Sequence, residues 1–165
     1  GEKWNPRESV EIVVGGVADL FGDYKNEEAT KAALIGDWLK TGDLATIDED
    51  WYMWLVDRKK DLIISGGVNI YPKEIEDVLV THPAISEAAV VGVPHPEWGE
   101  TVKVYFAANE QLDPEDVKQF ANERLAHFKV PRLYEQVEAL PRNASGKILK
   151  QPLRERSKDG HTTTV

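Results

Sequence analysis

The chain has 165 residues, with 29 acidic and 20 basic side chains, a formal net charge of −9 and no cysteine. An acidic surface repels phosphate, which argues against nucleic acid as a general partner. Without cysteine there are no disulfides or thiolate metal sites, and the four histidines lack paired ligand spacing, so we expect no metal site built by this chain alone. No apolar run approaches the roughly 20 residues of a membrane span, and no signal-peptide pattern opens the sequence, so a cytoplasmic protein is expected.

Strands and turns dominate the first third of the chain, with one short helix. The β-branched run Val10–Val14 predicts a strand that ends at a glycine turn. Asn26 can cap a helix whose first two residues are glutamates, which suit its positive end. Residues 44–47 and 51–56 flank three acidic residues and predict a hairpin. We therefore expect residues 1–58 to form a β-rich unit.

From residue 59 onward, helices and strands alternate in a pattern that predicts a compact α+β unit. The expected elements are a strand at 62–64, a helix at 72–81, strands at 87–93 and 101–107, a helix begun by Asp113, and a strand at 133–140. The fold class is therefore α+β, with a mixed sheet and helices packed on it.

Three details of this unit carry definite expectations. Apolar residues alternate with other residues along 101–107, so we expect one face of that strand to be buried. The apolar stripe of the helix after Asp113 is assigned to the core rather than to a cofactor. Pro152 is expected to interrupt a helix after Ile148, and residues 157–165 are expected to be disordered.

The C-terminal end is basic although the protein is acidic. Residues 141–158 contain six basic side chains and one acidic side chain. This distribution predicts a local anionic ligand, and a solvated basic tail is the alternative.

The stretch from Val56 to Glu76 places several local signals side by side. Five consecutive charged residues, 57–61, are expected at a surface or in a cleft between two bodies. Gly66 and Gly67, after a short apolar strand, allow positive φ and a close approach of a ligand to bare backbone. A charged bend before a rigid strand fits a pivot, and a solvated loop between two strands is the alternative.

Three motifs occur in an order typical of one family. They are Thr41-Gly42-Asp43, the segment from Val56 to Glu76, and the sequence LPRNASGKI at 140–148. Together they resemble the AMP-forming acyl-CoA synthetases of the adenylate-forming superfamily, over nearly the whole chain. The resemblance implies that 1–58 is the β-rich end of a large N-terminal adenylation domain, that 59–156 is its mobile C-terminal domain, and that 157–165 is a tail.

This family joins a carboxylic acid to coenzyme A in two steps, through an acyl-adenylate made with ATP. The resemblance implies that Lys147 is the catalytic cation of the first step, because an ammonium group can stabilise charge on the phosphate and the carboxylate. It also implies that Asp43 and Arg58 position the nucleotide, and that Lys60 is the hinge of a rotation between the steps. The residues implied to contact coenzyme A are Gly66, Gly67, Phe128, Lys129 and Arg132.

Further expectations concern ligands and the state of the chain. ATP and Mg²⁺ are expected to be held mainly by an N-terminal domain outside this sequence, coenzyme A is the implied co-substrate, and a fatty acid is the leading substrate. We expect the chain to be a fragment that is inactive alone, and the oligomeric state, including a homo-oligomer, stays open. The sequence departs from the family pattern at Asp23, where an aromatic residue is usual, and at Trp51, where a turn glycine is usual.

Alternatives remain at the level of residues and of the whole chain. Asp43 can be a turn residue, the glycine pair can be a structural turn, and Lys147 can be an ordinary exposed lysine. The chain can also be part of an adenylation domain that loads a carrier protein, or a non-catalytic interaction module.

Overall fold

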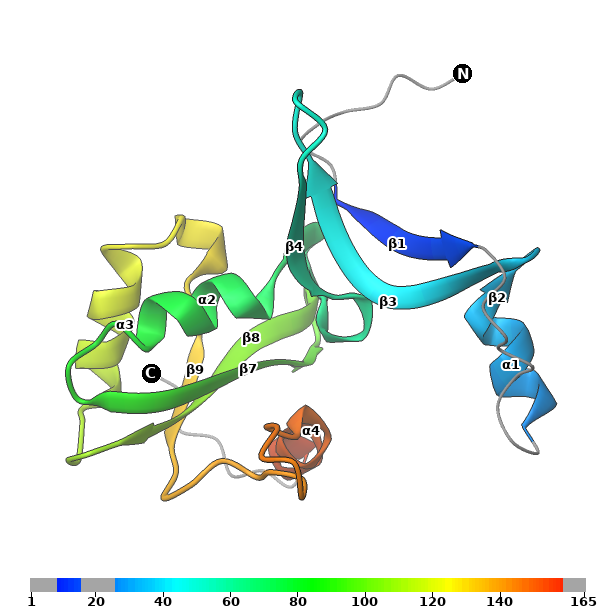
Figure 1. Cartoon of the computed structure of the whole chain (residues 1–165). Helices are drawn as coiled ribbons and strands as arrows, with labels where there is room; N and C mark the ends of the chain where they lie inside the picture. Colours follow the sequence, from blue (N-terminus) through cyan, green and yellow to red (C-terminus); the bar gives the residue numbers. More distant parts are fainter. Residues whose placement is uncertain (1–8, 16–25, 159–165) are drawn as a thin grey trace. The chain divides into compact units, whose positions relative to one another are not determined.

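A computed structural model describes residues 9–15 and 26–158 of the chain (Figure 1). The chain forms two compact units, and the boundary lies between Lys60 and Asp61. This boundary is two residues beyond the one expected after Arg58, and it directly follows the predicted hinge residue. The departure at Asp23 and residues 159–165 lie outside the described residues.

The first unit is an antiparallel sheet built on β3 (Trp38–Ile47). It is joined by β1 (Val10–Gly15), β2 (Leu34–Ile35) and β4 (Met53–Arg58). Asn26 caps α1 (Glu27–Ala33) as predicted, its Oδ1 accepting a hydrogen bond of 3.0 Å from the Ala29 amide.

The β3–β4 hairpin forms where the sequence predicted it. Its turn is held by the Asp48 carboxylate, which accepts hydrogen bonds from the Trp54 indole and from the Tyr52 and Asp50 amides. These bonds, above all the one from Trp54, lower the pKa of Asp48. Trp51 has φ of 66°, the left-handed region that glycine adopts without strain, which explains why the family pattern has glycine there.

The second unit is a mixed sheet with helices on it. Its elements are β5 (Ile63–Ser65), β6 (Val68–Ile70), α2 (Pro72–Leu79), β7 (Ile85–His95), β8 (Gly99–Ala108), α3 (Pro114–Asn122), a short 3-10 helix (His127–Lys129), β9 (Leu133–Gln136) and α4 (Lys150–Lys158). Another 3-10 helix, Lys59–Asp61, spans the boundary between the units. The central strand β8 pairs antiparallel with β7 and parallel with β9, so the predicted α+β class and mixed sheet are confirmed.

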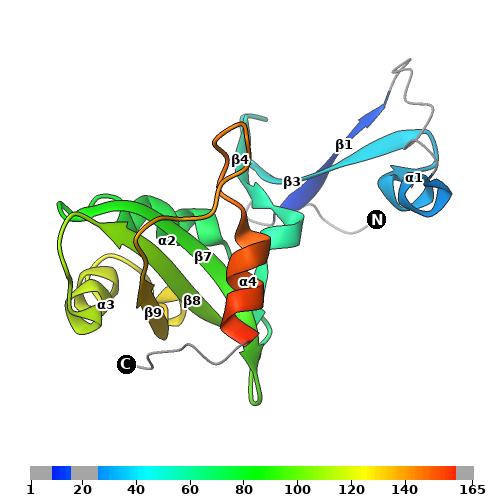
Figure 2. The same cartoon turned by 90° about the horizontal axis from the view of Figure 1, so that it is seen from below.

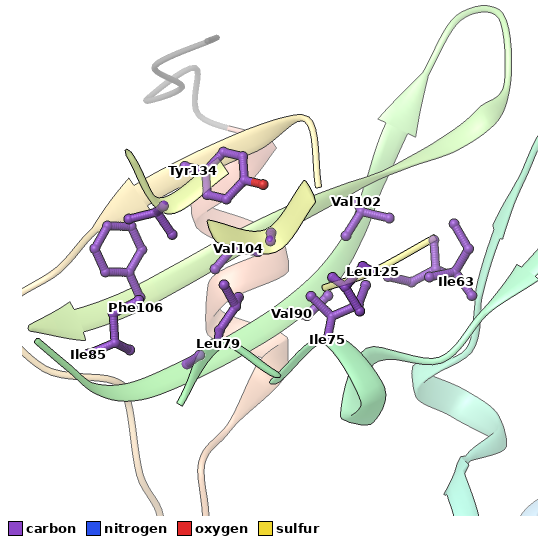
Figure 3. Close-up of a cluster of buried hydrophobic side chains, with 14 residues drawn as sticks. Ile63, Ile75, Leu79, Ile85, Val90, Val102, Val104, Phe106, Leu125 and Tyr134 are labelled. Carbon is purple, nitrogen blue, oxygen red and sulfur yellow. The ribbon is translucent and has the colours of Figure 1, made fainter. Parts of the chain in front are cut away.

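Helices α2 and α3 lie on one face of this sheet (Figure 1). Their apolar sides meet the inward side chains of β7, β8 and β9 in one core (Figure 3). Ile75 and Leu79 of α2 and Val117 and Ala121 of α3 are fully buried there. The stripe of α3 therefore belongs to the core, as predicted.

The other face of the sheet is also buried, which corrects the expectation of one buried face. Helix α4 crosses it (Figure 2), and Leu153 packs with Tyr105 of β8 in a second apolar cluster. The Lys103 side chain is buried on β8 as well, and its ammonium group lies 2.8 Å from a carboxylate oxygen of Glu135. The alternation of 101–107 was visible in the sequence, but the element that covers the second face was not.

Helix α4 also corrects two expectations about the C-terminal end. Pro152 is its third residue and does not interrupt it, because the first-turn amides of a helix have no partner within the helix. Ser157 and Lys158, expected to begin a disordered tail, are its last residues. Within residues 9–15 and 26–158, no helix is both long enough and apolar enough to cross a lipid bilayer.

Candidate functional site

Lys147 lies on a short, closed loop between β9 and α4. The loop is closed at its base by a bridge between Arg142 and Ile148 and by a hydrogen bond of 2.8 Å from the Leu149 amide to the Pro141 carbonyl. Gly146 has φ of 81°, so the backbone turns through a conformation that favours glycine. Lys147 is exposed, and its ammonium group has no ion-pair partner within the described part of the chain.

The side chain of Asn143 organises this loop, and the sequence analysis did not single it out. Its Oδ1 accepts hydrogen bonds from the Ser145 amide, the Ser145 hydroxyl and the Lys147 amide. An asparagine that precedes a serine and a glycine by two and three positions is a recognisable turn signal, and it could have indicated this role.

The two predicted nucleotide-binding residues are neighbours in the first unit. Asp43 on β3 is the cross-strand partner of Arg58 on β4, and Arg58 Nε lies 2.7 Å from Asp43 Oδ1. Asp43 is part of β3 and directly follows Gly42, whose φ is 72°. Arg58 and Lys60 also line an open hollow of roughly 450 Å³, together with Thr41, Gly42 and Lys59.

The glycine pair forms the two-residue turn of the β5–β6 hairpin. Gly66 and Gly67 have φ of 56° and 81°, which is the pattern of a type I′ turn, and Ser65 pairs with Val68 across it. A structural turn is therefore present, and it leaves the Gly66 backbone at the rim of a groove. The Gly66 amide donates a hydrogen bond of 3.0 Å to the Trp98 carbonyl.

Gly66, Phe128 and Arg132 line the same groove, which has a volume of about 230 Å³. The Arg132 guanidinium lies 3.5 Å from the centroid of the Trp98 ring, and the His95 ring stacks on the same ring with 4.2 Å between the centroids. Trp98 also lines the groove, and the sequence analysis did not single it out.

Lys129 differs from Phe128 and Arg132, because it does not line this groove. Its ammonium group lies 2.7 Å from both carboxylate oxygens of Glu74 on α2. Gly67 likewise lies outside the lining. The structure thus brings together three of the five residues implied to contact coenzyme A.

Asp61 is the buried member of the charged run 57–61, which was expected at a surface or in a cleft between two bodies. Its side chain is buried, and its Oδ1 lies 2.8 Å from a guanidinium nitrogen of Arg154 on α4. Among residues 9–15 and 26–158, no three His, Asp or Glu side chains are grouped closely enough to hold a metal ion.

Comparison with known proteins defines the class of the second unit. Residues 74–147 match the family described as the AMP-binding enzyme C-terminal domain. The second unit is therefore a domain of this kind, and the matched segment extends from α2 to Lys147.

Whole-chain relatives narrow the class further. The 2-succinylbenzoate–CoA ligase of Bacillus licheniformis is 44% identical over 153 residues, which are 93% of this chain and 32% of that protein. The structure of o-succinylbenzoate CoA synthetase from Bacillus subtilis with its acyl-adenylate intermediate superposes with a TM-score of 0.83 and 38% identity, over 98% of this chain and 33% of that one. The structure of ATP-bound MatB from Rhodopseudomonas palustris superposes with a TM-score of 0.84 and 38% identity, over 96% of this chain and 32% of that one.

The resemblance to the AMP-forming acyl-CoA synthetases that was drawn from the three motifs is confirmed, because the second unit matches their C-terminal domain family and the relatives and structural neighbours are CoA ligases and synthetases. It spans about a third of the length of the relatives it matches.

Proposed function

We propose that the chain is the hinge and C-terminal part of an AMP-forming carboxylate–CoA ligase. The observation that carries this proposal is Lys147: an exposed ammonium group without an ion-pair partner among the described residues, on a tied loop at the end of a matched AMP-binding C-terminal domain. An unpaired cation held at a fixed backbone position is suited to meet an anionic substrate.

In the first step the substrate carboxylate attacks the α-phosphate of ATP, the bond to pyrophosphate breaks, and an acyl-adenylate forms. Negative charge accumulates on the phosphate oxygens beside the incoming carboxylate. The Lys147 ammonium group stabilises that charge, and the loss of one such preorganised donor typically costs about 3 to 4 kcal/mol of transition-state stabilisation.

Asp43 and Arg58 position the nucleotide in this scheme. A carboxylate can accept hydrogen bonds from both ribose hydroxyls, and a guanidinium has further N–H groups for the ribose or a phosphate. The ion pair between these side chains supports the assignment, because it restricts both to the same side of the β3–β4 ladder.

In the second step the thiol of coenzyme A attacks the acyl carbon and AMP leaves. We assign the pivot of the rotation between the steps to Lys60, and the pantetheine contact to Gly66 and Gly67. Phe128 and Arg132 bind the nucleotide end of coenzyme A by stacking and phosphate pairing. Lys129 can join them only by giving up Glu74. We assign ATP and Mg²⁺ mainly to an N-terminal domain outside this sequence, as expected from the resemblance.

The acid is the least constrained part of the proposal. A fatty acid was expected from the sequence, whereas the relatives with 41–44% identity are named 2-succinylbenzoate–CoA ligases. We therefore place 2-succinylbenzoate first among the acids to be assayed, followed by medium-chain and long-chain fatty acids.

The test separates the two half-reactions in the full-length enzyme that contains this chain. Lys147→Ala is expected to lower acyl-adenylate formation by 10²-fold or more, and to leave thioester formation from supplied acyl-adenylate within a few fold. Lys158→Ala removes another exposed lysine of the basic end and is expected to change neither. Equal loss of both half-reactions in Lys147→Ala would overturn the division of roles.

Transfer to a carrier protein remains the second candidate. The names of the relatives favour coenzyme A. Supplying free coenzyme A and a carrier protein in parallel distinguishes the two acceptors, because only the true acceptor forms a thioester at a catalytic rate.

A further inference from the structure

The loop that carries Lys147 is tied together at two levels, by Asn143 within the loop and by Arg142 to the sheet. We propose that Asn143, supported by Arg142, is a positioning residue that sets where the Lys147 ammonium group can reach. This inference rests on the proposed role of Lys147 in adenylation, and it adds two residues to which no role in the reaction has been assigned above.

Asn143 fixes both peptide groups of Lys147. The side-chain Oδ1 of Asn143 accepts a hydrogen bond of 2.8 Å from the backbone N–H of Lys147. The backbone N–H of Asn143 donates one of 3.0 Å to the Lys147 carbonyl. The same Oδ1 binds the Ser145 amide at 3.1 Å and the Ser145 hydroxyl at 2.8 Å. The backbone of Lys147 is therefore held by Asn143 on both sides, once by its side chain and once by its backbone.

Arg142 connects the loop to the second unit as a whole. One guanidinium nitrogen lies 2.7 Å from a carboxylate oxygen of Glu87 on β7, and another donates to the Gly146 carbonyl. Strand β7 has buried side chains on both faces, so it is a rigid support. A chain of contacts thus leads from the sheet through Arg142 and Gly146 to Lys147.

The exposure of these residues argues that the ties serve position rather than folding. Residues 143–147 are all exposed, and Asn143 contributes no side chain to either apolar core. Solvent-exposed hydrogen bonds add little to global stability, because water replaces them when they break. A lysine stem has four rotatable bonds, so its reach is defined only if its Cα is fixed, and a 1 Å misplacement of a catalytic group can cost about 10²-fold in rate.

The first test is made on the chain itself and does not depend on catalysis. In Asn143→Ala, hydrogen exchange of the Lys147 amide is expected to accelerate about tenfold, as the loss of one hydrogen bond predicts. Asn143→Asp retains an acceptor oxygen and is expected to keep exchange within about twofold of the wild type. Asn122→Ala, an exposed asparagine on α3, is the matched control and should leave the Lys147 amide unchanged.

The second test uses the half-reactions of the full-length enzyme. Asn143→Ala is expected to lower kcat for adenylation 10- to 100-fold with KM for ATP little changed, to spare thioester formation from supplied acyl-adenylate, and to be largely rescued by Asn143→Asp. Arg142→Ala is expected to act in the same direction.

The outcomes separate the inference from the proposed function. Loss of adenylation in Lys147→Ala without loss in Asn143→Ala overturns the positioning role and leaves the function standing. Retained adenylation in Lys147→Ala overturns the function instead. Equal loss of both half-reactions in Asn143→Ala, or no rescue by Asn143→Asp, means that Asn143 is merely structural and also overturns the inference.

Discussion

At the scale of the residue, two tyrosines on neighbouring strands show how the hydrogen bonding of one buried hydroxyl affects stability. Tyr105 on β8 and Tyr134 on β9 are both fully buried. The Tyr105 hydroxyl lies 3.1 Å from the Leu153 carbonyl and 2.6 Å from the Ser157 hydroxyl. The Tyr134 hydroxyl, drawn in Figure 3, has no hydrogen-bond partner in the described part of the chain. A buried polar group without a partner lowers stability, whereas a paired one does not.

Opposite effects are therefore expected from the same substitution at the two positions. Tyr134→Phe should raise the free energy of unfolding by about 1 kcal/mol, and Tyr105→Phe should lower it by about 1 kcal/mol. Urea denaturation at pH 7 measures both. If Tyr134→Phe proved as destabilising as Tyr105→Phe, the hydroxyl of Tyr134 would have to be paired.

The pH dependence of the free energy of unfolding is a second test of the environment of Tyr134. Burial and, to a lesser extent, the charge of Glu115 raise its pKa above the usual value of about 10. Above pH 10 the unfolded chain releases the phenolic proton and the folded chain retains it, so the stability due to this group is lost as pH rises. Wild type should therefore lose stability more steeply than Tyr134→Phe between pH 10 and 11.

Residues whose roles depend on local chain geometry were the ones that the sequence revealed. Asn26 as a cap, the glycine pair as a turn and Trp51 in place of glycine all depend on neighbours within a few positions. Asp61 was expected at a surface or in a cleft between two bodies, but it is buried beside Arg154, which is 93 positions away in the sequence. No local pattern indicates such a pair, and the charge of Asp61 alone favoured exposure.

At the scale of the element, α4 is the part of the fold that the sequence concealed. Three ion pairs connect it to other elements: Lys150 to Glu76 of α2, Arg154 to Asp61, and Arg156 to Glu135 of β9. A proline in its first turn and many charged side chains hid a helix whose stability comes from packing and these long-range contacts. The motif at 140–148 was recognisable, but the helix that follows it in the chain was not.

The apolar anchor of α4 can be tested directly. Leu153 is 3% exposed, and its replacement by Ala is expected to cost about 3 kcal/mol of unfolding free energy, within the usual range for a buried leucine. Leu149→Ala is the matched control, because Leu149 is 37% exposed and should cost less than 1 kcal/mol. Thermal denaturation followed by circular dichroism compares the two, and similar losses would argue that α4 is held by its ion pairs instead.

At the scale of the whole molecule, the proposed function requires that the two units rotate about one short connecting segment. The units meet in sequence at Lys60, inside the 3-10 helix Lys59–Asp61. Each body has its own sheet, and the core of the second is complete on both faces. Such a body can move as a unit when a few connecting residues change φ and ψ.

Restricting that connection should separate the two half-reactions. Proline fixes φ near −65° and restricts the preceding residue, so Lys60→Pro in the full-length enzyme limits the rotation without touching either core. We expect one half-reaction to fall at least tenfold more than the other, whereas Lys60→Ala, which keeps a flexible backbone, should retain both. Single-turnover assays of adenylation and of thioester formation from supplied acyl-adenylate measure the ratio. Equal rates in Lys60→Pro and Lys60→Ala would show that the pivot lies elsewhere in the chain.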